Sequence, residues 1–261
     1  MKIQDFQKKK AGGVRISMVT CYDSWSAALV SESNVDCVLV GDSIAMTLYG
    51  HNSTLPADID LMAAHTAAVR RALPDKFIIG DMPFLSYRSG LTETMKNVGK
   101  LMRAGANAVK LEGAGGNIET VRHIIASGVP LMGHIGLTPQ AVNALGGFRV
   151  QGRCDEEILR LLNDARDLEE AGAFSLVLEA VPEKAAQQIS SSLRIPVIGI
   201  GAGAGTDGQV LVLQDLLGLT KGFKPKFVRN FLNGAELVIN ALNDYHREVL
   251  AGSFPASAEW Y

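Results

Sequence analysis

The sequence has few cysteines, no long apolar run and almost no excess of charge, and each absence excludes a class of protein. Cys21, Cys37 and Cys154 are far apart and lack a C-x-x-C spacing, which argues against a disulfide framework and a structural zinc site. No stretch reaches the roughly 18 apolar residues of a membrane helix, and residues 1–13 lack the apolar core of a secretory signal. We therefore expect no membrane partner and a cytoplasmic location.

The charge balance excludes a second class of protein. The formal net charge of −2 provides no overall field that would attract nucleic acid or an anionic surface. The basic run at residues 8–10 is short, and such runs are usually solvated surface. We expect no nucleic-acid partner, and we expect the basic run to be an exposed N-terminal face.

The pattern of apolar residues predicts the fold class. Runs rich in β-branched residues alternate with amphipathic stretches, which is typical of repeated βα units around a parallel sheet. The length of 261 residues is close to the roughly 250 residues of a (β/α)8 TIM-type barrel. We predict a single α/β barrel domain over 1–261, with a short N-terminal lead-in and an extended tail from about residue 252. The expected strands cover residues 16–21, 37–40, 77–79, 108–111, 130–133, 175–178, 196–200 and 210–213.

The segments between these strands predict the helices and two long loops. The expected helices cover residues 24–31, 58–73, 92–104, 118–127, 156–171, 183–193 and about 227–250, and the last one would complete the helical ring. The connection between the seventh and eighth strands, GAGAGTDGQ, is too short for a helix. The long segments 43–58 and 134–156 follow strands, so we expect them to form a wall or lid over a site.

Four acidic residues end four of the predicted strands. Asp42, Asp81, Glu112 and Glu179 follow the runs VDCVLVG, FIIG, AVKL and SLVL. The carboxyl ends of parallel strands meet at one edge, where α/β enzymes place their chemistry. Three crowded carboxylates repel one another, and a hard divalent cation such as Mg²⁺ relieves that repulsion. The alternative is that each acid caps a helix or forms an ion pair.

The remaining acid and two basic side chains complete the candidate site. Glu179 is expected two strands beyond the other acids and across the barrel from them, where it could act as a general base; its alternative is an ion pair with an Arg. Lys110 lies two residues before Glu112, so both side chains should face the interior. There Lys110 would be a counter-ion or a clamp on an anionic substrate. His134, at the end of the fifth strand, is either structural or functional.

The motifs that contain these residues resemble the ketopantoate hydroxymethyltransferase family over nearly the full length. They are VGDSIAMTLYGHNSTLP, HTAAVRR, GDMPF, RAGANAVKLEG, GHIGLTPQ, VQGR, LVLEAVP, IPVIGIGAG and DGQVLV. The resemblance implies a barrel of the phosphoenolpyruvate mutase and isocitrate lyase group that uses Mg²⁺ and assembles as a homodecamer. It also implies transfer of a hydroxymethyl group from 5,10-methylenetetrahydrofolate to 3-methyl-2-oxobutanoate, giving 2-dehydropantoate in pantothenate biosynthesis, so that the small-molecule partners are a 2-oxo acid and a folate.

The resemblance also implies a role for each candidate residue. It implies that Asp42, Asp81 and Glu112 hold the metal, that Asp42, Ser43, Asp81, Lys110 and His134 contact the 2-oxo acid, and that Glu179 accepts the substrate proton. The segment GAGGNIE after Glu112 and Cys21 in VTCYDS depart from the family pattern, but neither includes a proposed ligand. Two alternatives stay open: a Mg²⁺-dependent lyase or mutase that acts on another 2-oxo acid without folate, and a non-catalytic small-molecule sensor.

Overall fold

In the computed structural model, which describes residues 1–222 and 224–261, eight parallel strands pair in sequence order and close into a barrel. The strands are β1 (Ile16–Thr20), β2 (Cys37–Val40), β3 (Phe77–Asp81), β4 (Ala108–Glu112), β5 (Leu131–Gly136), β6 (Ser175–Glu179), β7 (Val197–Ile200) and β8 (Gly208–Leu211). Closure comes from the pairing of β1 with β8, where Ile16 lies opposite Gly208. The predicted TIM-type barrel is confirmed.

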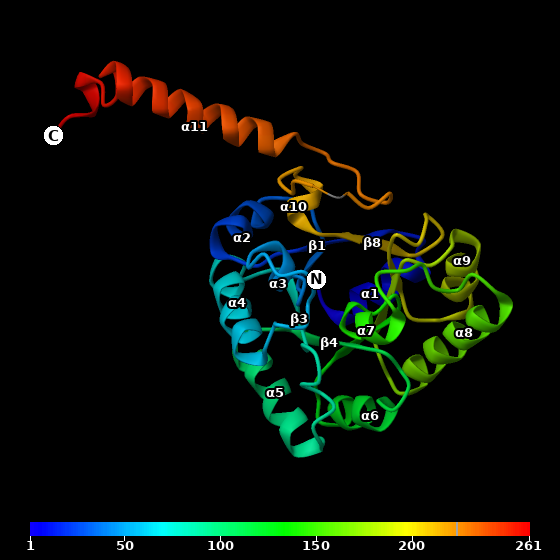
Figure 1. Cartoon of the computed structure of the whole chain (residues 1–261). Helices are drawn as coiled ribbons and strands as arrows, with labels where there is room; N and C mark the ends of the chain where they lie inside the picture. Colours follow the sequence, from blue (N-terminus) through cyan, green and yellow to red (C-terminus); the bar gives the residue numbers. More distant parts are fainter. Residues whose placement is uncertain (223) are drawn as a thin grey trace. The chain divides into compact units, whose positions relative to one another are not determined.

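Helices surround the strands in the barrel unit, as Figure 1 shows for α4, α5, α6 and α8. The helical elements of this unit are α1 (Ile3–Ala11), α2 (Ser24–Ser31), α3 (Ile44–Thr47), α4 (Ile59–Ala72), α5 (Leu91–Arg103), α6 (Ile118–Ala126), η1 (Pro139–Ala141), α7 (Val142–Leu145), α8 (Asp155–Glu170) and α9 (Glu183–Ser192). Asp23 and Asp58 are N-caps whose side chains accept hydrogen bonds from the main-chain N–H groups of Ser26 and Leu61. Such caps satisfy donors that the first helical turn leaves free.

The chain divides into two compact units, Met1–Leu211 and Val212–Tyr261. The second unit contains α10 (Leu213–Leu216), α11 (Gly234–Ala251) and η2 (Ser257–Glu259). The last long helix therefore begins seven residues later than predicted, because main-chain N–H groups of Phe231 and Gly234 bond back to Leu216 and Leu217 in a turn region. Its predicted place in the helical ring stays a prediction.

Most predicted elements are confirmed within a few residues of their expected ends. Strand β5 ends three residues later than predicted, at Gly136, and β8 is shifted as a whole by two residues, because it begins at Gly208 and not at residue 210. A Cβ at Gly208 would lie 2.4 Å from the main-chain oxygen of Ile16. The strand therefore starts at a glycine that permits close approach to β1, and apolar periodicity does not reveal such a position. Residues 201–207 contain no helix, as predicted.

Helix α1 covers the amino end of the barrel, where the sequence predicted only a lead-in. Phe6 is fully buried, and its ring packs edge-on against Phe77 and Phe174 at centroid distances of 5.2 and 5.0 Å. Phe77 begins β3 and Phe174 precedes β6. The aromatic cluster therefore fills the end of the barrel opposite the strand-end acids.

The expectation of a solvated basic run at residues 8–10 is wrong for two of its three lysines. Lys10 Nζ donates to the main-chain oxygens of Ser190 and Ile195 and to Asp207 Oδ2, at 2.8 to 2.9 Å. Lys9 Nζ lies 2.6 Å from an oxygen of Asp36. These bonds fasten α1 to the strand ends, so the positions are set by docking of the helix and not by solvation.

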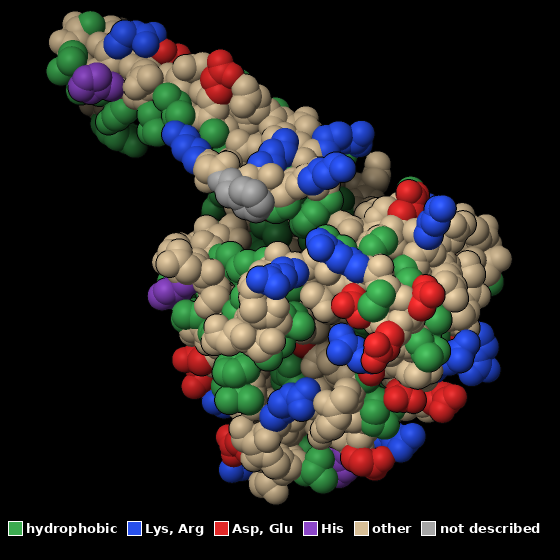
Figure 2. Space-filling model, turned by 45° about the vertical axis from the view of Figure 1, so that its right-hand side comes forward, with side chains coloured by type: hydrophobic (Ala, Val, Ile, Leu, Met, Phe, Trp, Pro, Cys, Tyr) green, Lys and Arg blue, Asp and Glu red, His purple; other side chains and the backbone are tan. Residues whose placement is uncertain are grey.

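Figure 2 shows Lys and Arg side chains interspersed with Asp and Glu side chains over the visible face of the barrel. Among the described residues, no helix is both long and apolar enough to cross a bilayer. Cys21 and Cys37 are buried and Cys154 is exposed, and all three are free thiols.

Candidate active site

The alternation of side chains along the strands produces a buried charged layer above an apolar one. On β3 the residues Phe77, Ile79 and Asp81 are two apart and buried, so they share one face. The same period on β4 places Lys110 and Glu112 on one face. The interior is thus apolar at the amino end and charged at the carboxyl end.

The strand register brings the predicted residues together. Asp81 lies opposite Lys110, and Glu112 lies opposite His134, while Gly136 lies opposite Glu179. Asp42 follows β2 by two residues, and its main-chain N–H donates to Asp81 Oδ2 at 3.2 Å. The buried members of this group, with exposed fractions of 1 to 4%, are Asp42, Asp81, Lys110, Glu112 and His134.

The basic side chains link the acids into one ionic network. Lys110 Nζ lies 2.7 Å from Asp81 Oδ1 and 3.9 Å from Glu112 Oε1. His134 Nδ1 lies 3.3 Å from Glu112 Oε1, and its Nε2 lies 3.3 Å from Glu179 Oε2. Lys110 is therefore the interior counter-ion that the sequence allowed, and the ion-pair alternative for the acids is met by Lys110 and His134.

The expected separation of Glu179 from the other acids by two strands is wrong for Glu112, although β6 does lie across the closed barrel from β2, which precedes Asp42. Only β5 separates β4 from β6, so Glu179 adjoins the network through His134. Among the described residues its ion-pair partner is this histidine and not the Arg of the alternative. The Glu179 side chain is 17% exposed, unlike the other acids, and it therefore stands at the border between the buried cluster and solvent.

Burial and the charges in the network shift the pKa values of the three buried acids in different directions. Burial raises the pKa of Asp42 well above its usual value, and the charges of Asp81 and Glu112 raise it further. Burial also raises the pKa of Asp81, with a further rise from Glu112, although Lys110 opposes this. For Glu112 burial is outweighed by His134, Lys110 and a hydrogen bond from the main chain of Gln140, which together lower its pKa. The ionised form is therefore disfavoured at the two aspartates and favoured at Glu112.

The same carboxylates shift the pKa values of His134 and Lys110. Burial and the Lys110 charge lower the pKa of His134, but Glu112 and Glu179 outweigh them and raise it to about 9. Burial lowers the pKa of Lys110, yet the charges of Asp81, Glu112 and Asp42 raise it above its ordinary value. Both side chains are therefore cations at neutral pH.

The donor set suits a magnesium ion that keeps water or substrate ligands. Asp81 Oδ1 and Glu112 Oε1 are buried without a hydrogen bond of good geometry, although Lys110 and His134 are near them. Among the described residues, no group of three or more His, Cys, Asp or Glu side chains is arranged to hold a metal. Because Mg²⁺ usually takes one or two carboxylates and retains several waters, orphaned carboxylate oxygens without a full protein cage fit it.

Ser43 is near the cluster but bonds elsewhere. Its Oγ lies 2.8 Å from the hydroxyl of Tyr22, which is fully buried. Burial raises the pKa of Tyr22 to about 12, so the phenol stays protonated and can orient the serine. Tyr22 was not predicted from the sequence, because its pairing with Ser43 depends on how the segments after β1 and β2 meet.

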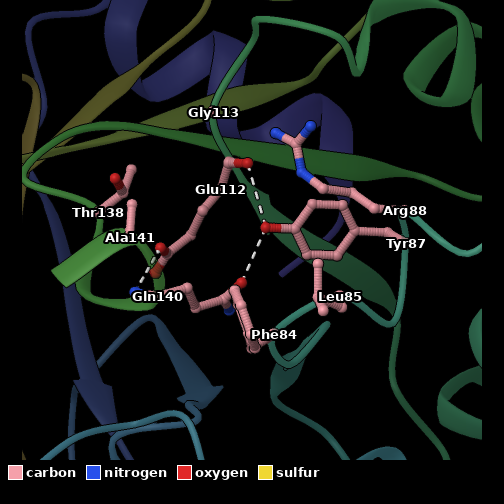
Figure 3. A pocket seen from close by; sticks show the side chains of 9 residues that line it. All are labelled: Phe84, Leu85, Tyr87, Arg88, Glu112, Gly113, Thr138, Gln140 and Ala141. Carbon is pink, nitrogen blue, oxygen red and sulfur yellow. Dashed lines mark hydrogen bonds between the residues drawn. The ribbon is translucent and has the colours of Figure 1, made fainter. Parts of the chain in front are cut away.

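A pocket opens beside Glu112, and its walls include residues that the sequence did not indicate (Figure 3). Its lining residues are Phe84, Leu85, Tyr87, Arg88, Glu112, Gly113, Thr138, Gln140 and Ala141. Four of these residues lie in the segment 84–88 after β3, three lie in the predicted loop after β5, and Glu112 and Gly113 lie at the end of β4. Leu85 has a positive φ of 61°, and such backbone strain is concentrated at functional sites.

Comparison with known proteins agrees with this geometry. A family model described as ketopantoate hydroxymethyltransferase matches residues 1–257. A 3-methyl-2-oxobutanoate hydroxymethyltransferase of Bdellovibrio bacteriovorus is 56% identical over 259 residues, covering 99% of this chain and 98% of that protein. The enzyme of the same name from Coxiella burnetii is 54% identical, with coverage of 98% and 96%.

Solved structures that resemble the chain show the same fold at low identity. A phosphonopyruvate hydrolase in complex with oxalate and Mg²⁺ superposes with a TM-score of 0.63 at 11% identity, covering 100% of this chain and 92% of that chain. A 2,3-dimethylmalate lyase, a member of the PEP mutase/isocitrate lyase superfamily, superposes with a TM-score of 0.61 at 14% identity, with coverage of 99% and 91%. These structures therefore share the barrel fold of this chain.

Proposed function

This chain belongs to the ketopantoate hydroxymethyltransferase family, and we propose that it transfers a hydroxymethyl group from 5,10-methylenetetrahydrofolate to 3-methyl-2-oxobutanoate. The product is 2-dehydropantoate, for pantothenate biosynthesis. The observation that supports this most is the buried network at the strand ends, in which two cations and three carboxylates adjoin the less buried Glu179. An enolate reaction needs an anion-stabilising site next to a base.

Glu179 is the proposed general base. It takes the proton from C3 of the 2-oxo acid, and the electron pair of that C–H bond passes toward the keto oxygen. The ring of His134, whose Nε2 lies 3.3 Å from Glu179 Oε2, holds the carboxylate of Glu179 in a fixed position beside the buried network. The position of Glu179 at the solvent border also lets the proton leave afterwards.

Lys110 stabilises the negative charge that develops. It is 3% exposed, and a buried ammonium interacts more strongly with a new anion than an exposed one does. The carboxylates of Asp42, Asp81 and Glu112 are the proposed holders of Mg²⁺, some of them through water, and Ser43 and His134 are further proposed substrate contacts. When bound, Mg²⁺ supplies Lewis-acid polarisation of the keto and carboxylate oxygens of the substrate.

The folate is proposed to approach through the pocket beside Glu112. The exposed side chains of Phe84 and Leu85 provide apolar surface for a flat ring, and Arg88 provides a positive charge at the rim. C3 of the substrate then forms a bond to the methylene carbon of the folate, and water supplies the hydroxyl oxygen on that carbon. Both bonds from the methylene carbon to the folate nitrogens break, and the two nitrogens take up the proton removed from C3 and one proton of the water.

The test is product identification with the purified chain, Mg²⁺, 3-methyl-2-oxobutanoate and 5,10-methylenetetrahydrofolate. We expect 2-dehydropantoate by mass spectrometry and none when any one component is left out. A chain that cleaves or rearranges the 2-oxo acid without folate would instead be the alternative lyase or mutase. The Asp81→Asn variant should bind Mg²⁺ roughly 10 to 100 times more weakly, and an unchanged titration would contradict the metal assignment.

Two broader features are part of the same proposal. We expect the reaction to take place in the cytoplasm and the chain to assemble as a homodecamer, as the family resemblance implies. Sedimentation velocity of the full chain tests the second expectation, and a monomer would contradict it.

A further inference from the structure

Gln140 is buried at the carboxyl end of the barrel and bonds to three different segments. Its exposed fraction is 4%. Its main-chain N–H donates to Glu112 Oε2 at 3.0 Å, and its side-chain Nε2 donates to Asp42 Oδ2 at 2.8 Å and to the main-chain oxygen of Met82 at 3.0 Å. One residue therefore connects two of the clustered carboxylates with the segment after β3.

The orientation of the Gln140 amide is set by its partners. Both neighbours of Nε2 are acceptors, so the nitrogen must face them. The amide oxygen accepts a hydrogen bond from the hydroxyl of Tyr87 at 2.8 Å, and the same hydroxyl lies 3.2 Å from the main-chain oxygen of Glu112. Tyr87 is also 4% exposed. Figure 3 shows Tyr87 between Gln140 and Glu112. A flipped amide would set Oε1 against two acceptors, so only one orientation is allowed.

These bonds tie one oxygen of each carboxylate, while the other oxygen of Glu112 faces His134 Nδ1 at 3.3 Å and Lys110 Nζ at 3.9 Å. Glu112 Oε2 is bonded to the main chain of Gln140, while Glu112 Oε1 is buried without a good hydrogen bond. Asp42 Oδ2 is bonded to the Gln140 amide. Without these donors, the negatively charged carboxylates of Asp42 and Glu112 would repel each other and their side chains would rotate apart. With them, the free oxygen of Glu112 keeps a fixed direction.

The local sequence explains how Gln140 reaches this position. It lies in η1, a single 3-10 turn that follows β5 and begins at Pro139. Proline fixes φ near the value that the first helical position needs. At the carboxyl end of β5, the turn therefore directs the main-chain N–H and the side chain of Gln140 toward the carboxylates of Glu112 and Asp42.

We propose that Gln140 is a positioning residue that orients the carboxylates of Asp42 and Glu112 for a divalent cation, and that the Tyr87 hydroxyl sets the direction of its amide. This inference rests on the proposed function, because the cation is the one proposed there. In this assignment Gln140 contacts neither the 2-oxo acid nor the reacting atoms, although it lines the pocket proposed for the folate. It acts through the two carboxylates, so its effect appears first in cation binding.

The experiment measures Mn²⁺ binding to the full chain without substrates, by electron paramagnetic resonance of free Mn²⁺. Gln140→Met keeps the length and the main-chain N–H but removes the amide, and it should raise the Mn²⁺ Kd roughly 10- to 100-fold. Tyr87→Phe removes only the hydroxyl and should raise it about 2- to 10-fold. Gln188→Met, at an exposed glutamine of α9, is the matched control and should leave the Kd unchanged.

The outcomes separate this inference from the proposed function. Equal Mn²⁺ Kd values for parent, Gln140→Met and Tyr87→Phe would overturn the positioning role, as would a parent chain that binds no Mn²⁺. A parent that binds Mn²⁺ but forms no 2-dehydropantoate would instead overturn the proposed function. If Gln140→Met fails to fold, as judged by circular dichroism, Tyr87→Phe decides alone. A purely structural role would lower the melting temperature and leave the Kd of the folded variant unchanged.

Discussion

Replacement of Glu179 by glutamine tests the proposed base with little disturbance of the structure. The amide has the same shape as the carboxylate, and Glu179 is 17% exposed with His134 Nε2 at 3.3 Å, so glutamine can still bond to that ring. It cannot accept a proton at neutral pH. Loss of a general base slows proton transfer roughly 10²- to 10⁴-fold, which corresponds to about 2.7 to 5.4 kcal/mol of activation free energy at 1.36 kcal/mol per factor of ten.

The assay is exchange of the C3 hydrogen of 3-methyl-2-oxobutanoate into D₂O, followed by proton NMR with Mg²⁺ and without folate. It isolates proton removal from the later steps. Glu183→Gln, at an exposed position at the start of α9, is the control and should exchange at the parent rate. If Glu179→Gln exchanges within about threefold of the parent, the carboxylate is not the base, because removal of a real one costs at least roughly a hundredfold.

Three further predictions concern stability and are measured by urea unfolding. The pKa of His134 is raised to about 9, above its unfolded value of 6.5. Its contribution to the free energy of unfolding is therefore complete below pH 6.5 and is lost as the pH rises through 9. His134→Gln should make this fall in stability with pH less steep, and an unchanged profile of stability against pH would contradict the reasoning. Lys10→Met should lower the free energy of unfolding by about 2 to 4 kcal/mol because it leaves buried acceptors unpaired. The control is Lys8→Met, at a side chain that is 77% exposed, and it should change the free energy of unfolding by less than about 0.5 kcal/mol. Gly136→Ala would place a Cβ 2.2 Å from the main-chain oxygen of Glu179 at a φ of 90°. At Gly128 φ is 85° and no atom lies within 4 Å of such a Cβ, so Gly136→Ala should lower the free energy of unfolding by about 2 kcal/mol more than Gly128→Ala. Equal losses of stability would mean that the backbone at Gly136 moves aside.

The strand-end acids could be predicted because their positions depend on local rules. Strand period fixes which side chains share a face, so Lys110 and Glu112 were placed correctly from their spacing alone. Sequential strand order in a barrel also places neighbours beside each other. The position of Glu179 relative to Glu112 was predicted wrongly. His134 was recognised at the end of the fifth strand, but its place between Glu112 and Glu179 was not inferred.

Gln140 and Tyr87 could not be predicted, because their roles depend on contacts between distant segments. The bond from Gln140 to Asp42 joins residues 98 apart, and the bond from Tyr87 to Gln140 joins residues 53 apart. Gln140 lies in the single turn η1 and Tyr87 lies in a turn after β3, where no period predicts the direction of a side chain. The one available signal was Pro139 before Gln140, which favours a helical turn directly after a strand.

The division of charge in the cluster explains why an anionic substrate and a cation belong together here. The raised pKa values of Asp42 and Asp81 show that Lys110 and His134 do not neutralise all the carboxylates. A 2-oxo acid brings another negative charge into the same buried space, and like charges in low dielectric repel strongly. The divalent cation proposed at these carboxylates would reverse the sign of that interaction. In the proposed function the fixed carboxylates would therefore act twice, because they would hold the cation and so make a site that repels the substrate into one that binds it.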